Sequence, residues 1–230
     1  MSFYAIGDLH LSLDGKKPMD IFGEEWKNHY QKIEKGFSRV GEDDTVLLCG
    51  DLSWGMSLDG SRLDFDFIAA LPGKKILLKG NHDYWWTTAK KMKNFFVESG
   101  WVDFEILHNN CVMYGDTAIC GSRGWFFEEN FGEPADEKVY KRELLRLEAS
   151  LECGKNASEI IAFLHYPPVF GNNFVCEDIV ELLERYGVKR CCYAHLHGAA
   201  RRHAFERELR GIDFKLISGD HLGFVPVKIL

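Results

Sequence analysis

The stretch Phe3-Tyr4-Ala5-Ile6-Gly7-Asp8-Leu9-His10 places an Asp-x-His pair directly after a short apolar run. That run has the length and composition of a buried β-strand. Four later apolar runs also end in Asp, Asn or His. The five junctions are Phe3–Gly7 before Asp8 and His10, Val46–Cys49 before Gly50-Asp51, Ile76–Lys79 before Gly80-Asn81-His82-Asp83, Ile160–Leu164 before His165, and Arg190–Tyr193 before Ala194-His195-Leu196-His197. The predicted fold and function both depend on this repeated pattern of a strand followed by polar side chains.

The rest of the chain alternates short strands with helical stretches, which predicts an α/β fold. Helices are expected at Glu24–Val40, Leu63–Ala70, Thr87–Ser99, Asp136–Leu151 and Glu177–Tyr186. Further strands are expected at Val112–Tyr114, Ala118–Cys120, Phe214–Ile217 and Val225–Ile229. We predict one domain over residues 1–230, with a mixed sheet or two packed sheets. The polar segments Asp14–Glu24 and Glu128–Glu137 are expected to form lids or edges.

Composition narrows the function classes. With 46% hydrophobic residues the chain can bury a core, which excludes a disordered protein. The net charge of −7 disfavours a protein that coats nucleic acid. No apolar run approaches the ~20 residues of a membrane span, and the N-terminus has no secretion signal. We therefore expect a cytoplasmic protein without a membrane partner, whose cysteines are reduced, buried and structural.

The polar residues at the strand ends have the chemistry of metal ligands. Parallel strands in an α/β sheet point their C-terminal ends at one rim, so these side chains should converge. Asp8 and His10, and likewise His195 and His197, are two residues apart, which in extended backbone puts both side chains on one face. Imidazole and carboxylate together suit Mn, Fe or Zn. The set exceeds the needs of one tetrahedral ion, so a two-metal site is the simplest interpretation.

Taken singly, these motifs are ordinary, since Gly-Asp and Gly-Asn are common in turns. In this order, however, they resemble the calcineurin-like metallophosphoesterase superfamily. The resemblance implies a four-layer sandwich of two mixed β-sheets flanked by helices. It also implies a first metal held by Asp8, His10, Asp51 and His197, and a second held by Asp51, Asn81, His165 and His195. Asp51 would bridge the two ions, and His82 matches the family's general acid.

The chain departs from the family pattern in two places. Ala194 stands where the family often has glycine before the final His-x-His, and its methyl group should fit if the backbone there is ordinary. The protein-phosphatase branch has Gly-Asp-x-x-Asp-Arg-Gly, whereas this chain reads Gly50-Asp51-Leu52-Ser53-Trp54-Gly55. It lacks both the Asp that orients the catalytic His and the phosphate-binding Arg, which argues against a phosphoprotein phosphatase. What orients His82 stays open, because the neighbouring Asp83 side chain should diverge from it.

The expected activity is hydrolysis of a phosphomonoester or phosphodiester, by attack of a metal-bridging hydroxide while His82 protonates the leaving group. The expected cofactors are two divalent or trivalent ions of Mn, Fe or Zn. The substrate is expected to be a small molecule, and nucleic acid is not favoured. The alternative is a catalytically silent module with the same fold that binds metal or a protein partner.

Some residues have both a functional and an ordinary interpretation. Arg123, between glycines after a strand, could bind substrate or could be a surface residue in a turn. Trp85-Trp86 and Trp125-Phe126-Phe127 could line a pocket or stack on a base, although such aromatics more often lie in a core or at a rim. His221 is treated as structural. The remaining histidines, expected on surfaces or in loops, are His29, His108 and His203.

Overall fold

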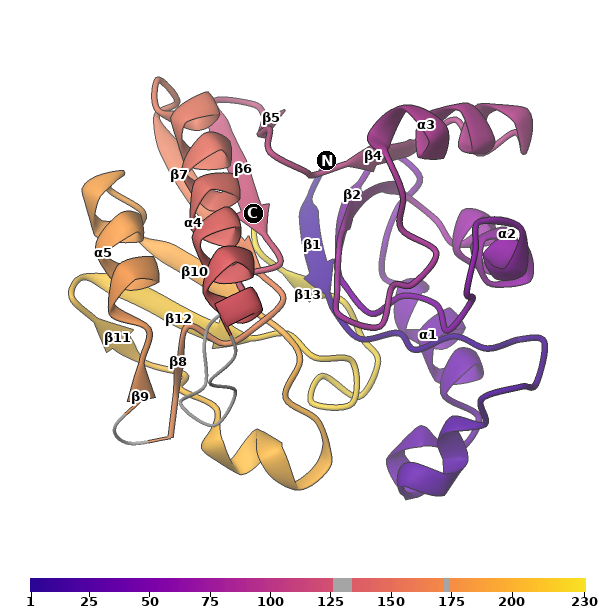
Figure 1. Ribbon diagram of the computed structural model, residues 1–230. Coiled ribbons are helices and arrows are strands. Elements are labelled where there is room, and N and C mark those ends of the chain that lie inside the picture. The colour runs from indigo at the N-terminus through magenta and orange to yellow at the C-terminus, as the bar shows by residue number, and fades with distance from the viewer. Residues whose placement is uncertain (126–133, 172–173) are drawn as a thin grey trace.

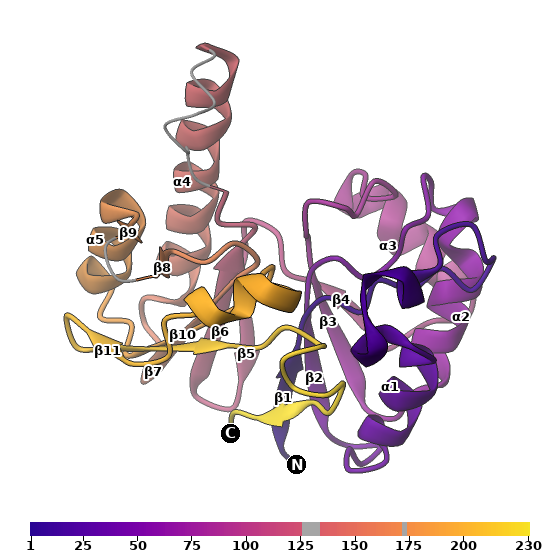
Figure 2. The same ribbon diagram turned by 90° about the horizontal axis from the view of Figure 1, so that it is seen from below.

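Two mixed β-sheets lie face to face at the centre of the protein, with helices on their outer surfaces (Figures 1 and 2). The computed structural model describes residues 1–125, 134–171 and 174–230. The first sheet has the order β13-β1-β2-β3-β4, with bounds Val227–Lys228, Phe3–Ile6, Thr45–Cys49, Lys74–Leu78 and Phe104–Ile106. The second has the order β11-β12-β10-β7-β6-β5, with bounds Glu208–Leu209, Ile212–Leu216, Arg190–Tyr193, Glu159–Leu164, Thr117–Ser122 and Val112–Tyr114. The predicted α/β fold with two mixed sheets is confirmed.

The strands at the centre of both sheets are parallel. In the first sheet β1, β2, β3 and β4 pair in parallel, and β13 is antiparallel to β1. In the second, β6, β7, β10 and β12 are parallel, and the edge strands β5 and β11 are antiparallel to their neighbours. The C-terminal ends of the parallel strands within each sheet therefore lie at one edge, where the predicted ligands follow.

Continuous apolar strands arise here because both faces of each sheet are buried. In β2, Leu47 packs between the sheets while its neighbours Val46 and Leu48 pack against the helices. In β7, Phe163 packs between the sheets and Ala162 packs on the outer side. Alternate residues of one strand thus enter two different cores, which fixes the position of each strand's last residue and of the loop that follows.

In the described part of the chain, five α-helices form the outer layers. The first sheet is covered by α1, α2 and α3, with bounds His29–Phe37, Arg62–Ala70 and Ala89–Glu98, and the second by α4 and α5, with bounds Pro134–Gly154 and Glu177–Arg185. The predicted helix over Glu24–Val40 is wrong in extent. It is a short 3₁₀ turn, Glu24–Trp26, followed by α1, because Asn28 adopts a left-handed backbone (φ 51°) that no helix can continue through. Thr88 caps α3, so that helix begins after the predicted Thr87.

The two sheets are joined where the first ligand motif begins. The Gly7 N–H donates to the carbonyl oxygen of Ile217 at 2.7 Å, directly after β1 and β12. A Cβ atom on Gly7 would lie 2.6 Å from the Ala194 methyl group, so the two chains can approach only because position 7 is glycine. Ala194 does not have a left-handed backbone. The methyl group at this departure from the family pattern therefore fits, as predicted.

Several segments differ from the sequence prediction or lie outside it. The short edge strands β4 and β11 were not predicted, and neither was the two-stranded pair β8 (Val169–Phe170) and β9 (Phe174–Val175). Part of the expected lid Asp14–Glu24 is a 3₁₀ helix, Met19–Phe22. Most of the expected lid Glu128–Glu137 lies outside the described residues, as do Phe126 and Phe127. Among the described helices, none is long and apolar enough to cross a membrane.

Candidate metal centre

The loops that carry the predicted ligands have strained backbones. Asp8, His10, Asp51 and His195 adopt left-handed conformations with φ of 57°, 44°, 53° and 73°. The prediction that Asp8 and His10, and His195 and His197, lie in extended backbone is therefore wrong for Asp8, His10 and His195, whereas His197 is extended with φ of −117°. Tight turns bring the side chains together instead. Backbone hydrogen bonds hold these turns, since the Asp8 N–H donates to the Gly50 carbonyl and the His10 N–H to the Asp51 carbonyl, each at 2.9 Å. Backbone strain of this kind is concentrated at functional sites.

The first ligand cluster contains Asp8, His10 and His197. One potential ligand atom from each lies within 4.8 Å of the other two. The Nε2 atoms of His10 and His197 face one another at 3.1 Å, and His197 Nε2 lies 3.4 Å from Asp8 Oδ1. Asp8 and His10 come from the first sheet and His197 from the second, so the cluster forms only where the two sheets meet.

The second cluster contains Asp51, His165 and His195, again with potential ligand atoms within 4.8 Å of each other. Asn81 belongs beside it, because its Oδ1 lies 2.7 Å from His165 Nε2. Asp51 Oδ2 is 3.4 Å from His165 Nε2 and 3.7 Å from His10 Nε2. This oxygen therefore lies between the two clusters, which is the position a bridging ligand needs.

In the buried carboxylates of Asp8 and Asp51, one oxygen accepts a hydrogen bond and the other does not. Asp8 Oδ2 accepts the His195 N–H at 2.9 Å, and Asp51 Oδ1 accepts the His82 N–H at 2.7 Å. The other oxygens, Asp8 Oδ1 and Asp51 Oδ2, are buried and have no hydrogen-bond partner within the described part of the chain. Each faces an imidazole nitrogen at 3.4 Å, His197 Nε2 and His165 Nε2 respectively, without a hydrogen bond. A buried carboxylate oxygen without a hydrogen bond is costly, and a cation would satisfy both. The donor set of carboxylate, imidazole and amide fits Mn, Fe or Zn.

The pKa values of the histidines also indicate that the two carboxylates favour positive charge in the site. Burial lowers the pKa of His165, but the Asp51 and Asp8 carboxylates outweigh burial and raise it to about 9. For His197, burial is likewise outweighed by Asp8 and by Asp220, and the pKa rises to about 10. Burial lowers the pKa of His10 to about 4. Two imidazoles thus hold protons that neutralise the carboxylates, a role that bound cations can take over.

Two outer contacts orient the ligand rings. His165 Nδ1 lies 3.0 Å from the Cys49 carbonyl oxygen, to which it can only donate, so Nε2 faces Asp51 and Asn81. His197 Nδ1 lies 3.3 Å from Asp220 Oδ1. The sequence analysis missed Asp220, which lies four residues after the end of β12, farther from its strand than the ligands that follow β1, β2 and β7. The adjacent His221, treated there as structural, lies instead 3.4 Å from Glu206 Oε2.

His82 lies beside the clusters and is held by aromatic residues. Its ring centroid is 4.5 Å from that of Trp54, and its Nδ1 is 3.3 Å from the Tyr84 hydroxyl. Trp54 stands at the motif position where the protein-phosphatase branch has its orienting Asp. The sequence left open which residues orient His82, and in the structure these are Trp54, through its ring, and Tyr84, through its hydroxyl group.

Asp83 does not contact the His82 ring but supports the loops around it. Its buried carboxylate accepts backbone N–H groups from Asp51 at 2.9 Å, Leu52 at 2.8 Å and Gly80 at 2.7 Å. It also accepts the Trp85 indole N–H at 2.9 Å. Burial, together with the Asp51 charge, raises the pKa of Asp83 to about 6. One carboxylate therefore ties the loop after β2 to the loop after β3.

The structure also places Arg123, Trp85 and the histidines outside the two clusters. Arg123 is partly buried, with its Nη2 atom 3.6 Å from Glu143 Oε1 on α4. Trp85 is a core residue that is 1% exposed, so it cannot stack on a ligand. The prediction that His29 lies on the surface or in a loop is wrong, because it is buried in α1 against Trp26 and Phe224. His108 is half-buried and His203 is exposed.

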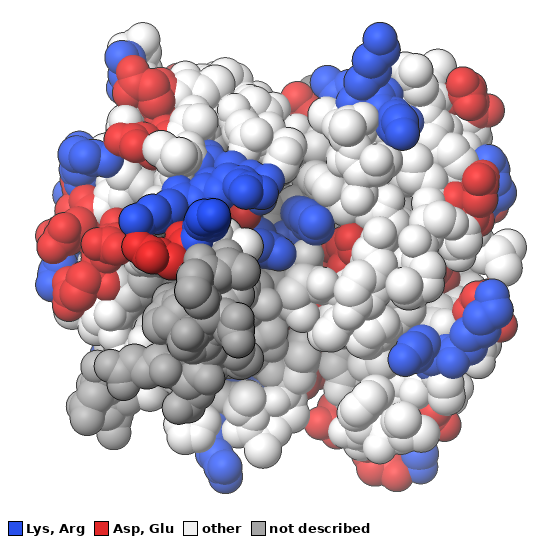
Figure 3. Space-filling view, in the orientation of Figure 1, with Lys and Arg blue, Asp and Glu red and all other residues white. Residues whose placement is uncertain are grey.

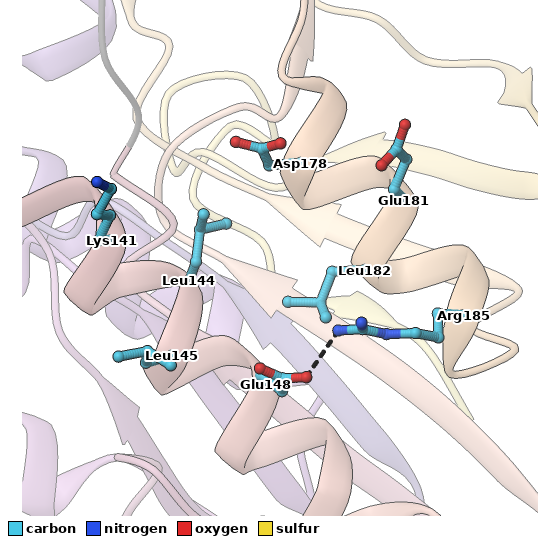
Figure 4. A pocket seen from close by; sticks show the side chains of 8 residues that line it. All are labelled: Lys141, Leu144, Leu145, Glu148, Asp178, Glu181, Leu182 and Arg185. Carbon is cyan, nitrogen blue, oxygen red and sulfur yellow. Dashed lines mark hydrogen bonds and ion pairs between the residues drawn. The ribbon is translucent and has the colours of Figure 1, made fainter. Parts of the chain in front are cut away.

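Charge and surface shape around the site are uneven. Figure 3 shows Lys and Arg side chains gathered over α4 and continuing toward the junction of the two halves of the molecule. A separate cleft of about 690 Å³ lies between α4 and α5, where Arg185 pairs with Glu148 at 2.7 Å (Figure 4). None of the predicted metal ligands lines that cleft.

Two sheets that meet at a pair of carboxylate–histidine clusters define a metal-binding α/β protein. A family model described as calcineurin-like phosphoesterase matches residues 1–199, and the chain belongs to that family. The Gene 66 protein of Mycobacterium phage L5 is 38% identical over 79 residues, which span 33% of this chain and only 37% of that relative's length.

Solved structures share the fold. A phosphopantetheinyl hydrolase from Mycobacterium tuberculosis has a TM-score of 0.55 at 14% identity, with 100% of this chain and 95% of that chain covered. A protein of unknown function from Aquifex aeolicus has a TM-score of 0.54 at 15% identity, with 99% and 95% covered. At these identities the likeness concerns the fold alone.

Proposed function

We propose that the chain is a metal-dependent phosphoesterase that hydrolyses a small phosphomonoester or phosphodiester. The observation that carries this proposal is a pair of buried oxygens, Asp8 Oδ1 and Asp51 Oδ2, that face imidazole nitrogens and have no hydrogen bond among the described residues. Asp8, His10, Asp51 and His197 would hold one ion, and Asp51, Asn81, His165 and His195 the other. When bound, two such cations lower the pKa of a coordinated water and neutralise phosphate oxygens.

The protein's own residues complete the reaction. His82 would give a proton to the oxygen that leaves phosphorus as water adds to it, and the aromatic contacts with Trp54 and Tyr84 would hold its ring in place. The Asn81 amide, beside His165, would donate to a phosphate oxygen as charge builds there. Arg123 is a further candidate donor, because its carbonyl oxygen accepts the Tyr166 N–H at 2.9 Å, which places its backbone next to the residue that follows His165.

A silent module with the same fold is the competing function. It would have no use for a complete ligand set or for a histidine beside that set. The chain has both, which favours the enzyme. The net charge of −7 favours a small substrate over a nucleic acid.

The test is an assay of the metal-free protein against nitrophenyl phosphate and bis(nitrophenyl) phosphate, with Mn, Fe or Zn restored in turn. We expect hydrolysis only with metal, and the preferred ester separates a monoesterase from a diesterase. Asp51→Asn should abolish hydrolysis, whereas Asp213→Asn, an exposed Asp on β12, should not. Metal binding without turnover of either ester would favour the silent module.

A further inference from the structure

A buried carboxylate on α4, that of Glu143, contacts two arginine side chains near the metal centre. Glu143 is 2% exposed, and its Oε1 accepts a hydrogen bond from Arg146 and lies 3.6 Å from Arg123 Nη2. Lys79 follows β3, two residues before the predicted ligand Asn81. Leu78, the residue before Lys79, lies against Gly121 near the end of β6, because a Cβ atom on Gly121 would be 2.9 Å from Leu78 Cδ1. Arg123 directly follows β6, and the charges of Arg123, Arg146 and Glu143 act on Lys79 at this place. We call Lys79, Arg123, Glu143 and Arg146 the Glu143 cluster.

The Glu143 cluster carries more positive charge than it can pair internally. Lys79, Arg123 and Arg146 share the Glu143 carboxylate, in a chain whose net charge is −7. The Asp83 carboxylate also acts on Lys79, but its oxygens already accept hydrogen bonds from three backbone N–H groups and the Trp85 indole, so the cations still outnumber the carboxylates. Lys79 is half-buried, and its ammonium group has no hydrogen bond or ion pair with any described residue. The Arg123 Nε atom is also buried without a partner among the described residues. A partly desolvated cation without a partner destabilises the folded protein, so an anion would improve its environment.

The cluster also has the preorganisation of an anion site. Glu143 holds the guanidinium of Arg146 in a fixed orientation, and planar guanidinium groups bind phosphate oxygens in pairs. The backbone ties the cluster to the metal centre at two points: the Arg123 carbonyl oxygen accepts the N–H of the residue after His165, and Lys79 lies in the loop that carries Asn81.

We propose that Lys79 and Arg146, with Arg123 beside them, bind a second phosphoryl group of the substrate while the ester phosphate lies at the metal ligands. This inference rests on the proposed function and extends it, because it names the substrate class as a phosphate ester that carries a further phosphate. If the cluster only anchored α4, Glu143 would account for Arg123 and Arg146. It would not account for Lys79. Substitution of Lys79 therefore distinguishes an anion-binding cluster from one that only anchors α4.

The test compares ligand pairs that differ by one phosphoryl group. The pairs are phosphate with pyrophosphate, and adenosine monophosphate with adenosine diphosphate. Dissociation constants for the manganese-loaded protein are measured by calorimetry. In the wild type we expect the doubly phosphorylated member of at least one pair to bind about tenfold more tightly, as one additional charged hydrogen bond or more would give. In Lys79→Met that preference should fall to within about twofold of unity.

Two controls separate binding from folding. Lys141→Met removes the same charge from the exposed α4 surface at the other cleft and should keep the wild-type preference. Lys79→Met should raise the midpoint of urea unfolding of the ligand-free protein, because it removes an unpaired, half-buried charge. If Lys79 were structural, the midpoint would fall. Arg146→Lys is a second variant that keeps a positive charge next to Glu143 and should reduce the preference less than Lys79→Met.

The outcomes distinguish this inference from the proposed function. Equal affinities within both pairs in the wild type, or a preference unchanged by Lys79→Met, would overturn the inference even if nitrophenyl phosphate is hydrolysed. A Lys79-dependent preference in a protein that hydrolyses no ester would support the binding site and overturn the proposed function.

Discussion

Gly80→Ala should disrupt the metal centre through a single methyl group. A Cβ atom at this position would lie 2.1 Å from Asp51 Oδ1 and 2.2 Å from the Asp51 nitrogen. Both distances are more than about 1 Å short of the ~3.5 Å at which non-bonded heavy atoms pack. Neither neighbour can move freely, because the Asp51 N–H and the Gly80 N–H both donate to Asp83.

The magnitude follows from this geometry. Forcing a methyl group into a packed interior costs about 1–3 kcal/mol of unfolding free energy. The larger effect should be on function, because the displaced residue is the proposed bridging ligand. A shift of about 1 Å at a reacting centre can cost ~10²-fold in rate. We therefore expect a modest loss of stability and a loss of activity of about two orders of magnitude.

The assay is hydrolysis of nitrophenyl phosphate by manganese-loaded protein, with urea unfolding and metal content measured on the same samples. Gly41→Ala is the matched control, because a Cβ atom there would have its nearest contact at 3.4 Å, with Asp44 Oδ2. That variant should behave as the wild type. If Gly80→Ala retained full metal content and activity within twofold of the control, the assignment of Asp51 to a rigid bridging position would be wrong.

Three further predictions concern other parts of the protein. His82→Ala should slow hydrolysis of alkyl phosphate esters ~10²–10⁴-fold but of nitrophenyl esters far less, because nitrophenolate leaves without a proton. His203→Ala is the control and should leave both rates unchanged. Equal losses on the two kinds of ester in His82→Ala would show that His82 is not the general acid. Asp220→Asn should weaken metal affinity ~10–100-fold in a calorimetric titration, because it supports the His197 ring; unchanged affinity would show that this contact is dispensable. Burial lowers the pKa of Lys75 from 10.5 to about 8, so the folded wild type is destabilised below that pH and recovers stability as pH rises from 8 to 10.5. That shift corresponds to about 3 kcal/mol at pH 7, and loss of the hydrogen bond from Lys75 to the Leu71 carbonyl costs about 1 kcal/mol. Lys75→Met should therefore add about 2 kcal/mol to the unfolding free energy at pH 7. An advantage that stays constant up to pH 10.5 would contradict this sign.

The sequence predicted the ligand positions because they follow from two strong physical signals. A strand buried on both faces reads as an uninterrupted apolar run, as in β2, and the first polar residue after it must lie at the edge of the sheet. Asp51 and His165 could therefore be placed at strand ends without knowledge of the loops. The order in which the motifs occur then pointed to the family that the comparison shows.

The parts that were missed depend on interactions between distant segments. Nothing local indicates that Asp220 supports His197, or that Trp54 and Tyr84 hold His82, because these contacts exist only once the sheets and loops are packed. The left-handed backbone of Asp8 could not be inferred either, since aspartate more commonly adopts other conformations and tertiary hydrogen bonds select this one. Edge strands such as β4 are too short to carry a periodic signal.

The central claim is that Asp51 joins two ions, and electron paramagnetic resonance of the manganese-loaded protein tests it most directly. Two Mn(II) ions held ~3.5–4 Å apart by a shared carboxylate would be magnetically coupled. The account predicts a coupled spectrum at saturation for the wild type and its loss in Asp51→Asn. A spectrum of isolated ions in the saturated wild-type protein would contradict it.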